Sequence, residues 1–415
     1  MSAMFALVLG VLAALGTVLA SVRVRRPAAS IFPVMMVSWL VGELAVFHLV
    51  LQTAAIAVLV GTGALNRGSG EVGVALLAAS VVGLVQVQYR ASRAHLVLDR
   101  ALRDGFGPTY PEHFGAESAS AVTPPPPSHA WRPFHFDRRG LEVIHDVAYG
   151  EHPKRHRLDI YRPAGTTPAD GLPVVVFVHG GAWMIGNKEQ QGKPLMCHLA
   201  RRGYLAVTIN YRLAPRHRWP AQIIDVKRAI AWVHEHGGQY GGDASFLAVA
   251  GSSAGGHLVA LCALTPGDAA FQPGFETADT SVSACIPIYA PFDLTDSARL
   301  RGLTALHLFL ERLVMPTKLH ADPAGWQSAS PLFRIHAAAP PMFVIQGAID
   351  TLVWREESRN FVDALRAVSD APVVFAELPA TTHAFEVFNS VRSRAAVDAI
   401  ARFLAVVHRE QPARR

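Results

Sequence analysis

The first 90 residues of the chain are dominated by long apolar runs. Residues 3–22 are almost entirely apolar, and a helix of that length can cross about 30 Å of hydrocarbon. The stretch 33–64 is too long for one perpendicular helix and too short for two spans joined by a turn, so we expect one tilted helix there. A third apolar run covers residues 72–89. The pattern predicts a transmembrane region over residues 1–103 with about three helices.

Beyond this region, short apolar runs alternate with segments of helical periodicity. The runs expected to be strands are 158–161, 174–178, 205–209, 246–250, 284–288, 342–345 and 373–375. The segments expected to be helices are 189–202, 220–236, 253–264, 356–368 and 391–407. Apolar strands that alternate with helices are typical of a mostly parallel sheet covered by helices on both faces. We therefore expect an α/β domain over residues 141–415.

Two segments interrupt this alternation. Periodicity disappears between residues 104 and 140, where four consecutive prolines are typical of a stiff spacer. We expect this linker to hold the α/β domain away from the bilayer without fixing its orientation. Residues 291–340 are long for a connection between strands, and they carry leucines at helical spacing: Leu303, Leu306, Leu310 and Leu313. A cap insertion over an acyl pocket and ordinary core packing explain this stripe equally well.

The arginines predict how the apolar helices are oriented. Only Arg67 lies between the second and third runs. The others of this region follow the first and third runs: Arg23, Arg25, Arg26, Arg90, Arg93, Arg100 and Arg103. The positive-inside rule then places the N-terminus outside and everything after residue 90 in the cytoplasm. We expect a multi-pass protein of the cell membrane with a cytoplasmic α/β domain.

Two features of the apolar region have competing explanations. A signal peptide carries basic residues before its apolar core, whereas the arginines here follow the first run, so a membrane span is favoured. Glu43 and His48 lie in the second run, where ionisable side chains are costly and often functional. A role in helix packing or at the membrane interface is the simpler explanation for this pair.

Composition excludes several other classes of protein. Of the 415 residues, 51% are hydrophobic and 17% are charged, and the apolar residues concentrate before residue 90. The net charge of +6 is not arranged as a basic stripe with interleaved aromatic residues, so we expect no nucleic-acid partner. Cys197, Cys262 and Cys285 are too few and too scattered for a disulfide framework or a metal site. We expect reduced thiols, no metal and no cofactor.

The sequence VAGSSAGGH is the first candidate for chemistry. It joins an expected strand to an expected helix and contains the pattern G-x-S-x-G, which places a serine on a strained turn with its hydroxyl exposed above the sheet. The register selects Ser253, because Gly251 and Gly255 flank it and give the room that a tight turn needs. Ser252 has alanines at both flanking positions.

A second motif, HGGAW at residues 179–183, follows directly after an expected strand. Acyl transfer needs N–H donors aimed at the oxyanion, and a Gly-Gly backbone can bring such groups close. We expect these donors at Gly180, Gly181 and Ala254, with His179 and Trp183 supporting the loop. A phosphate-binding turn is the alternative, but the chain has neither a Lys-Ser/Thr ending here nor G-x-G-x-x-G.

A serine nucleophile needs a base that is itself oriented by an acid. Asp350 follows one expected strand, and His383 lies in the loop after the next. The chain order Ser, Asp, His is characteristic of serine hydrolases with this architecture. Glu356 and Glu357 are rival acids, but both fall inside an expected helix. We therefore expect Ser253, Asp350 and His383 to form a catalytic triad.

Together, these motifs resemble the esterase and lipase branch of the α/β-hydrolase superfamily, close to the hormone-sensitive-lipase-like carboxylesterases. The matching motifs are HGGAW, NYRLAP at 210–215, GSSAG at 251–255, GAID at 347–350 and THAF at 382–385. The resemblance covers about residues 145–410 and implies an α/β-hydrolase fold with Ser253 as nucleophile, His383 as base and Asp350 as the acid. Ala182 stands where the family often has a third glycine. The apolar N-terminus is similar to that of certain actinobacterial lipase-type esterases.

The function expected is that of a membrane-anchored serine carboxylesterase or lipase that hydrolyses short- to medium-chain or lipophilic esters through an acyl-enzyme. Its expected partners are an ester or lipid substrate and the bilayer, and the sequence gives no oligomeric state. Arylformamidases, which the tryptophan after HGG resembles, and plant prenylcysteine methylesterases are alternatives. A catalytically silent binding module is less favoured because no triad residue is missing. A transporter is disfavoured because only about 90 residues are apolar enough to lie in a membrane.

Overall fold

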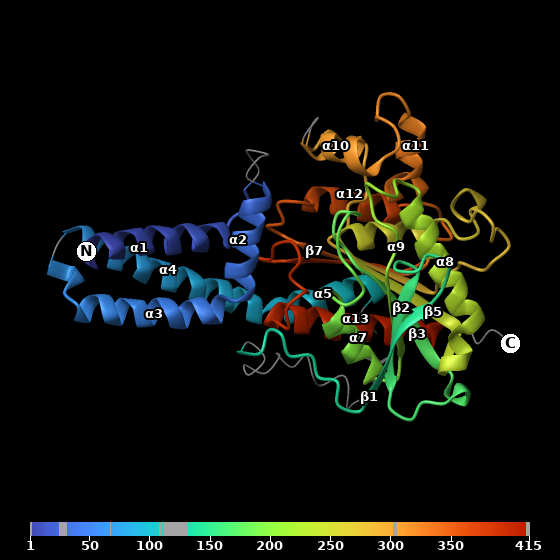
Figure 1. The fold of residues 1–415 in the computed structure, drawn as a ribbon, viewed down its shortest axis with the longest axis horizontal. Helices are drawn as coiled ribbons and strands as arrows, with labels where there is room; N and C mark the ends of the chain where they lie inside the picture. Colours follow the sequence, from blue (N-terminus) through green and yellow to red (C-terminus); the bar gives the residue numbers. More distant parts are fainter. Residues whose placement is uncertain are drawn as a thin grey trace.

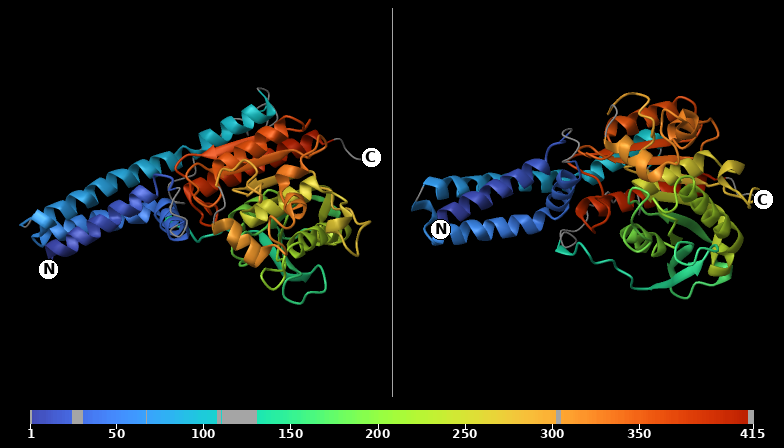
Figure 2. Two further views of the ribbon diagram at one scale, coloured as in Figure 1. Left: turned by 90° about the horizontal axis from the view of Figure 1, so that it is seen from above. Right: turned by 45° about the horizontal axis from the view of Figure 1, so that its top comes forward.

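The computed structural model describes residues 2–24, 31–66, 68–107, 110, 131–301 and 305–411. It contains an elongated helical bundle joined to a larger α/β domain (Figure 1). The bundle projects from one end of the α/β domain, as the further views also show (Figure 2).

An eight-stranded sheet forms the centre of the α/β domain. Its strands are β1 (Leu141–Ala148), β2 (Arg157–Pro163), β3 (Leu172–Val178), β4 (Leu205–Ile209), β5 (Gly242–Ser252), β6 (Ala284–Ile288), β7 (Met342–Gly347) and β8 (Val373–Leu378). The order across the sheet is β1-β2-β4-β3-β5-β6-β7-β8, with β2 antiparallel to both of its neighbours and all other pairs parallel. All seven expected strands are present in this mostly parallel sheet.

The hydrophobic pattern missed β1, which lies at the edge of the sheet. Its sequence LEVIHDVA is exposed or only partly buried along its whole length. A register shift between Ile144 and Val147 also breaks its pairing with β2. An edge strand that buries neither face carries no clean signal of alternation.

Helices cover both faces of the sheet. Along β3, Val174, Val176 and Val178 point into one core, and Val175 and Phe177 point into the other. The first core is covered by α8 (Ala221–His236), α9 (Ala254–Leu264) and α12 (Arg355–Arg366), and the second by α5 (Ala94–Phe106), α7 (Lys193–Ala200) and α13 (Val391–Glu410). The five helices expected in this domain are all present.

Residues 291–340 join β6 to β7 and contain short helical segments in their described part: α10 (Ala305–Phe309), a π-helical turn (Leu310–Val314) and α11 (Pro323–Ser328). Figure 1 shows α10 and α11 at the outer margin of the domain, beyond α12. Leu310 is buried in the first core, and Leu306 and Leu313 pack against it. Leu303 lies outside the described residues.

The bundle consists of α1 (Ser2–Leu19), α2 (Ile31–Glu43), α3 (Ala45–Gly61) and α4 (Gly68–Ser92), and α4 leads directly into α5. The single helix expected over 33–64 is wrong, because α2 and α3 are bent by 83° at Leu44. Figure 1 shows α2 running across the end of the bundle, between α1 and α3 on one side and the α/β domain on the other. The bend allows Glu43, at the end of α2, to reach an arginine of the α/β domain.

By length and composition, one helix, Gly68–Phe106, is long and apolar enough to cross a bilayer, or two if the bent pair α2 and α3 counts as one span. The apolar part of α1 is shorter. Most of the exposed large hydrophobic side chains in the described residues lie between Met4 and Tyr89. The helical region is thus largely apolar. Of the three spans expected from the sequence, only the third lies in a single helix of spanning length.

The α/β domain is fixed directly to the helical region. α5 packs into the second core, and its Asp99 pairs with Arg402 of α13 at 2.9 Å. Arg392 pairs with Glu43 of α2 at 3.1 Å. The expectation that a linker leaves the domain's orientation free is therefore wrong. The four prolines that suggested it lie outside the described residues.

We predict that Gly73→Ala loosens the contact between α1 and α4. A Cβ at Gly73 would clash with the backbone of Ala6, so the two helices would have to move apart. Overpacking of this kind typically costs about 1–3 kcal/mol. Gly61→Ala is the matched control, because nothing described lies within 4 Å of its added Cβ. Thermal unfolding of the full chain in detergent measures both, and equal melting temperatures would contradict the prediction.

Candidate active site

Ser253 occupies a sharp turn between β5 and α9. Its backbone has φ 54° and ψ −122°, a strained conformation for a residue with a Cβ. A Cβ at Gly251 would lie 2.5 Å from the carbonyl oxygen of Gly255, and one at Gly255 would clash with that of Val178. Both flanking glycines are therefore required by close backbone packing, which is the register that the sequence indicated.

The Ser253 hydroxyl, His383 and Asp350 form a hydrogen-bonded chain. His383 Nδ1 lies 2.7 Å from Asp350 Oδ2, and its Nε2 lies 2.9 Å from Ser253 Oγ. Because Nδ1–H donates to the carboxylate, Nε2 of the neutral ring is free to accept the serine proton. The structure thus brings together the three residues that the sequence selected, from positions 97 and 130 residues beyond Ser253 along the chain.

Asp350 is held in place by several donors. Its Oδ1 accepts the backbone N–H groups of Leu352 and Val353 at 2.8 and 3.0 Å, and Gln346 Nε2 donates to Oδ2 at 3.3 Å. The residue is only 1% exposed. These contacts fix the face that the carboxylate presents to His383.

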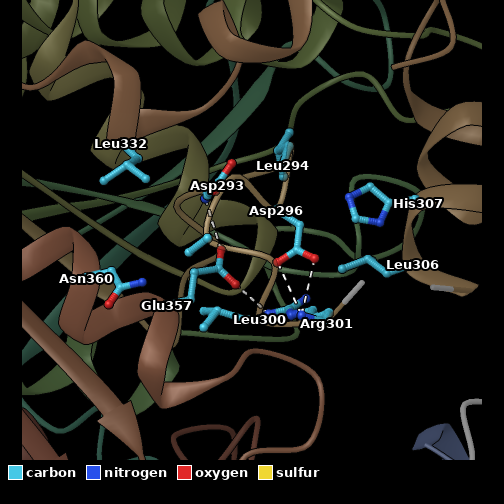
Figure 3. Close-up of a pocket in the computed structure, with 11 residues that line it drawn as sticks. Asp293, Leu294, Asp296, Leu300, Arg301, Leu306, His307, Leu332, Glu357 and Asn360 are labelled. Carbon is cyan, nitrogen blue, oxygen red and sulfur yellow. Dashed lines mark hydrogen bonds and ion pairs between the residues drawn. The ribbon is translucent and has the colours of Figure 1, made fainter. Parts of the chain in front are cut away.

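The rival acids, Glu356 and Glu357, serve other partners. Glu356 accepts a salt bridge from Arg23 at 2.6 Å. Glu357 pairs with Arg301 and accepts the N–H groups of Phe292 and Asp293, and burial raises its pKa. Figure 3 shows the Glu357 carboxylate directed towards Arg301 in a small pocket that Leu306 and His307 also line. Glu357 therefore organises the insertion, and Glu356 binds the segment that follows α1; neither contacts His383 in the described residues.

The HGGAW loop departs from expectation at Gly180. The Gly180 N–H donates to Gln191 Oε1 at 2.6 Å, so it is already satisfied and is not available as an oxyanion donor. Gly180 is needed for a steric reason, since a Cβ there would lie 2.7 Å from Ser252 O and 2.9 Å from Ser253 Cβ. The oxyanion role predicted for this residue is thus corrected to one of close packing.

The N–H groups of Gly181 and Ala254 have no acceptor in the part of the chain that the structure describes. Ala254 begins α9, where the first N–H groups of a helix are unpaired and carry partial positive charge. Gly181 has φ 117°, and Ala182 follows with φ 52°. Ala182 thus adopts a left-handed conformation that is costly for a residue with a Cβ, and a glycine would adopt it without that cost.

His179 and Trp183 support the loop from within the core. His179 Nδ1 donates to Gly180 O at 2.7 Å, its ring stacks on Tyr211 at 4.4 Å, and the Tyr211 hydroxyl donates to His179 O. Trp183 is 4% exposed, and its indole N–H donates to His257 Nδ1 at 3.3 Å. His257 Nε2 in turn donates to Ala329 O at 2.7 Å. The loop is thus attached to α9 and to the insertion.

Sequence reasoning missed three polar residues beside the triad. Gln191 Oε1 accepts both the Gly180 N–H and, at 2.9 Å, the Ser252 hydroxyl, which gives the second serine of the motif a bracing role. Tyr289 lies with its ring centroid 4.4 Å from that of His383, and its hydroxyl donates to the buried Glu386. Burial raises the pKa of both Tyr289 and Glu386. The sequence offered one signal for these residues: Tyr289 lies directly after the expected strand 284–288, where functional side chains of such sheets gather.

Comparison with known proteins places this geometry in a family. The BD-FAE family model matches residues 158–365. The probable carboxylic ester hydrolase LipM of Mycobacterium tuberculosis is 41% identical over 96% of this chain and 93% of its own. The chain belongs to the α/β-hydrolase carboxylesterases. It is therefore a carboxylic ester hydrolase of the EC 3.1.1 type.

Two further comparisons agree with this carboxylesterase assignment. Esterase LipQ of the same organism is 40% identical over 79% of this chain and 78% of its own. A structure of Thermogutta terrifontis esterase 2, phosphoramylated by tabun, aligns with a TM-score of 0.55 at 26% identity and covers 66% of this chain and 98% of that one. The LipM match covers 96% of this chain and so extends through the apolar N-terminal region as well.

We predict that this carboxylesterase loses stability as the pH falls below about 6.5. Burial lowers the pKa of His179 and of His257 to about 4. Between pH 6.5 and 4 the unfolded chain therefore binds more protons than the folded one, and stability falls with decreasing pH by about 1 kcal/mol per pH unit for each histidine. The expected result is a lower melting temperature at pH 5 than at pH 7.5.

In His257→Gln the drop between the two pH values should be smaller, because one of these titrating groups is gone and the amide can still donate to Ala329 O. The exposed His320→Gln is the control and should behave as the wild type does. An equal drop in all three proteins would contradict the role of His257.

Proposed function

We propose that Ser253, His383 and Asp350 carry out ester hydrolysis through an acyl-enzyme. His383 Nε2 removes the Ser253 proton as Oγ bonds to the ester carbonyl carbon, and Asp350 stabilises the charged ring. The alcohol leaves with the proton from His383, and water then repeats the sequence to release the acid. The observation that carries this proposal is the hydrogen-bonded chain through His383, with 2.9 Å to the strained serine and 2.7 Å to the carboxylate.

The oxyanion is held, on this proposal, by the N–H groups of Gly181 and Ala254. Ala254 follows the reacting serine in the chain, and Gly181 follows Gly180, which packs against that serine. Neither N–H has another acceptor in the described residues. Ala254 is at the N-terminus of α9, where the partial positive charge of the helix dipole also stabilises the oxyanion. Loss of one such donor typically raises the barrier by about 3–4 kcal/mol.

The proposed substrates are short- to medium-chain or lipophilic esters met at a membrane. Support comes from the apolar helices, whose large side chains are exposed along much of residues 4–89, and from α2, which contacts the loop that carries His383. Exposed apolar surface of this extent is expected to be covered by lipid.

Replacement of the serines distinguishes the two hydroxyls of the motif. Ser253→Ala should abolish labelling by a fluorophosphonate and lower kcat/KM for a p-nitrophenyl ester by at least about a thousandfold. Ser252→Ala should still be labelled, because the Ser252 hydroxyl faces Gln191 rather than His383. Labelling of Ser253→Ala at the wild-type rate would overturn the mechanism.

The substrate class is defined with a panel of p-nitrophenyl esters of increasing chain length. Each ester is compared with the matching anilide and with an aryl formamide. Esters should be hydrolysed faster than both nitrogen analogues. Preferential cleavage of the formamide would instead favour the arylformamidase alternative.

Membrane attachment and its side are tested together in cells that express the full chain. The protein should stay in the membrane pellet after extraction with alkaline carbonate. Carbonate releases peripheral proteins, whereas helices inserted in the bilayer stay with the lipid. The α/β domain should resist protease added to intact cells and be digested after lysis. Release by carbonate would contradict the anchor, and digestion in intact cells would contradict the cytoplasmic side.

A further inference from the structure

Helix α2 contacts the segment that joins His383 to α13. In both further views α2 lies where the bundle meets the α/β domain (Figure 2). The contacts come from Trp39 and Glu43, which lie four residues apart and therefore on one face of the helix. They reach the segment at its start, its middle and its end.

Trp39 binds the residue next to the catalytic histidine. Its indole N–H donates to the carbonyl oxygen of Ala384 at 2.8 Å. Ala384 has φ 62°, so the chain leaves His383 through a left-handed residue that is not glycine and that needs outside support. This partly buried hydrogen bond to the Ala384 carbonyl holds the peptide plane in the orientation that the His383 ring requires.

The ring of Trp39 also packs against the middle of the segment. It stacks on Phe388 with centroids 4.8 Å apart and an interplanar angle of 19°. Phe134 meets the same Phe388 ring edge-on at 5.4 Å. Asn389 is held beside it, because its N–H donates to Pro133 O at 2.8 Å.

Glu43 binds the end of the segment, where α13 begins. Ser390 is the N-cap of α13 and accepts the N–H of Ser393, while its hydroxyl donates to Glu43 Oε2 at 2.6 Å. Arg392 pairs with Glu43 Oε1 at 3.1 Å, and both side chains are 1% exposed. Removing one partner of a buried pair leaves an uncompensated charge, so this contact fixes α2 against the domain.

We propose that α2 is a positioning element of the active site, in which Trp39 holds the peptide after His383 and thereby aligns His383 with Ser253. The proposal rests on the triad function proposed above. It assigns a catalytic contribution to the apolar N-terminal region, which then acts on the reaction as well as anchoring the enzyme. Trp39 touches neither Ser253 nor the substrate carbonyl, and its effect passes entirely through the His383 loop.

The alternative explanation is that α2 only docks the bundle onto a domain that is complete without it. The two explanations differ in what happens to molecules that remain folded. Docking alone predicts fewer folded molecules with unchanged turnover per active site. Positioning predicts a lower turnover in each of them, because His383 is aligned for less of the time.

The test uses Trp39→Phe in the full chain in detergent, which keeps an aromatic ring against Phe388 and removes the N–H donor. Active sites are counted by exhaustive fluorophosphonate labelling, and kcat for p-nitrophenyl butyrate is expressed per labelled site. We expect kcat per site to fall about fivefold or more with KM changed less than twofold. Leu40→Ala, on the partly exposed side of α2, is the control and should keep the wild-type kcat.

Phe388→Leu is the second variant, because it removes the stacking partner from the loop and leaves the Trp39 N–H in place. It should lower kcat per site by a smaller factor than Trp39→Phe. Wild-type kcat per site in Trp39→Phe would overturn the positioning role, whether or not its melting temperature falls. Failure of the wild type itself to be labelled would instead overturn the proposed triad, so the two failures are distinguishable.

Discussion

The active site depends on the close approach of two backbones, the end of β3 and the turn after β5. No Cβ fits at Gly255 because the carbonyl of Val178 occupies its place, and none fits at Gly180 because Ser252 and Ser253 lie there. This packing forces Ser253 into its strained conformation and places its hydroxyl at the sheet edge where β7 and β8 also end. Parallel strands deliver the acid and the base to that same edge.

The rest of the site stabilises that strained turn. Gln191 ties Ser252 to the HGGAW loop through one carbonyl oxygen, and the histidine of the loop is fixed by its stack on Tyr211. Trp183 and His257 join the same loop to α9. The Trp183–His257 contact is buried and the two contacts of Gln191 are part-buried. An unsatisfied partner is costly in such places, so the arrangement resists small displacements of the serine.

The sequence was sufficient for seven of the eight strands and for selecting the three residues that the structure joins by hydrogen bonds. Each leaves a local signal: apolar strands, glycines at the turn, and an Asp and a His after successive strands. It was insufficient where tertiary contact decides. Gly180 looked like an oxyanion donor until Gln191, eleven residues away, proved to bind its N–H. β1 shows no alternation because it is an exposed edge, and the bend at Leu44 goes with a pair between Glu43 and Arg392, about 350 residues apart in the chain.

The bend at Leu44 also changes how the apolar region relates to catalysis. A straight helix over 33–64 would have continued along the bundle and would not have turned Glu43 towards Arg392. Turned by 83°, α2 instead pairs Glu43 with Arg392 and places Trp39 against the residue after His383. α5 provides a second attachment, because it packs in the second core together with α13. Because the helical region contacts the α/β domain through both α2 and α5, tilting the helices against the domain would move Ala384, and with it His383, relative to Ser253. Glu43, one of the two ionisable residues noted in the second apolar run, thus belongs to the contact between the helices and the α/β domain.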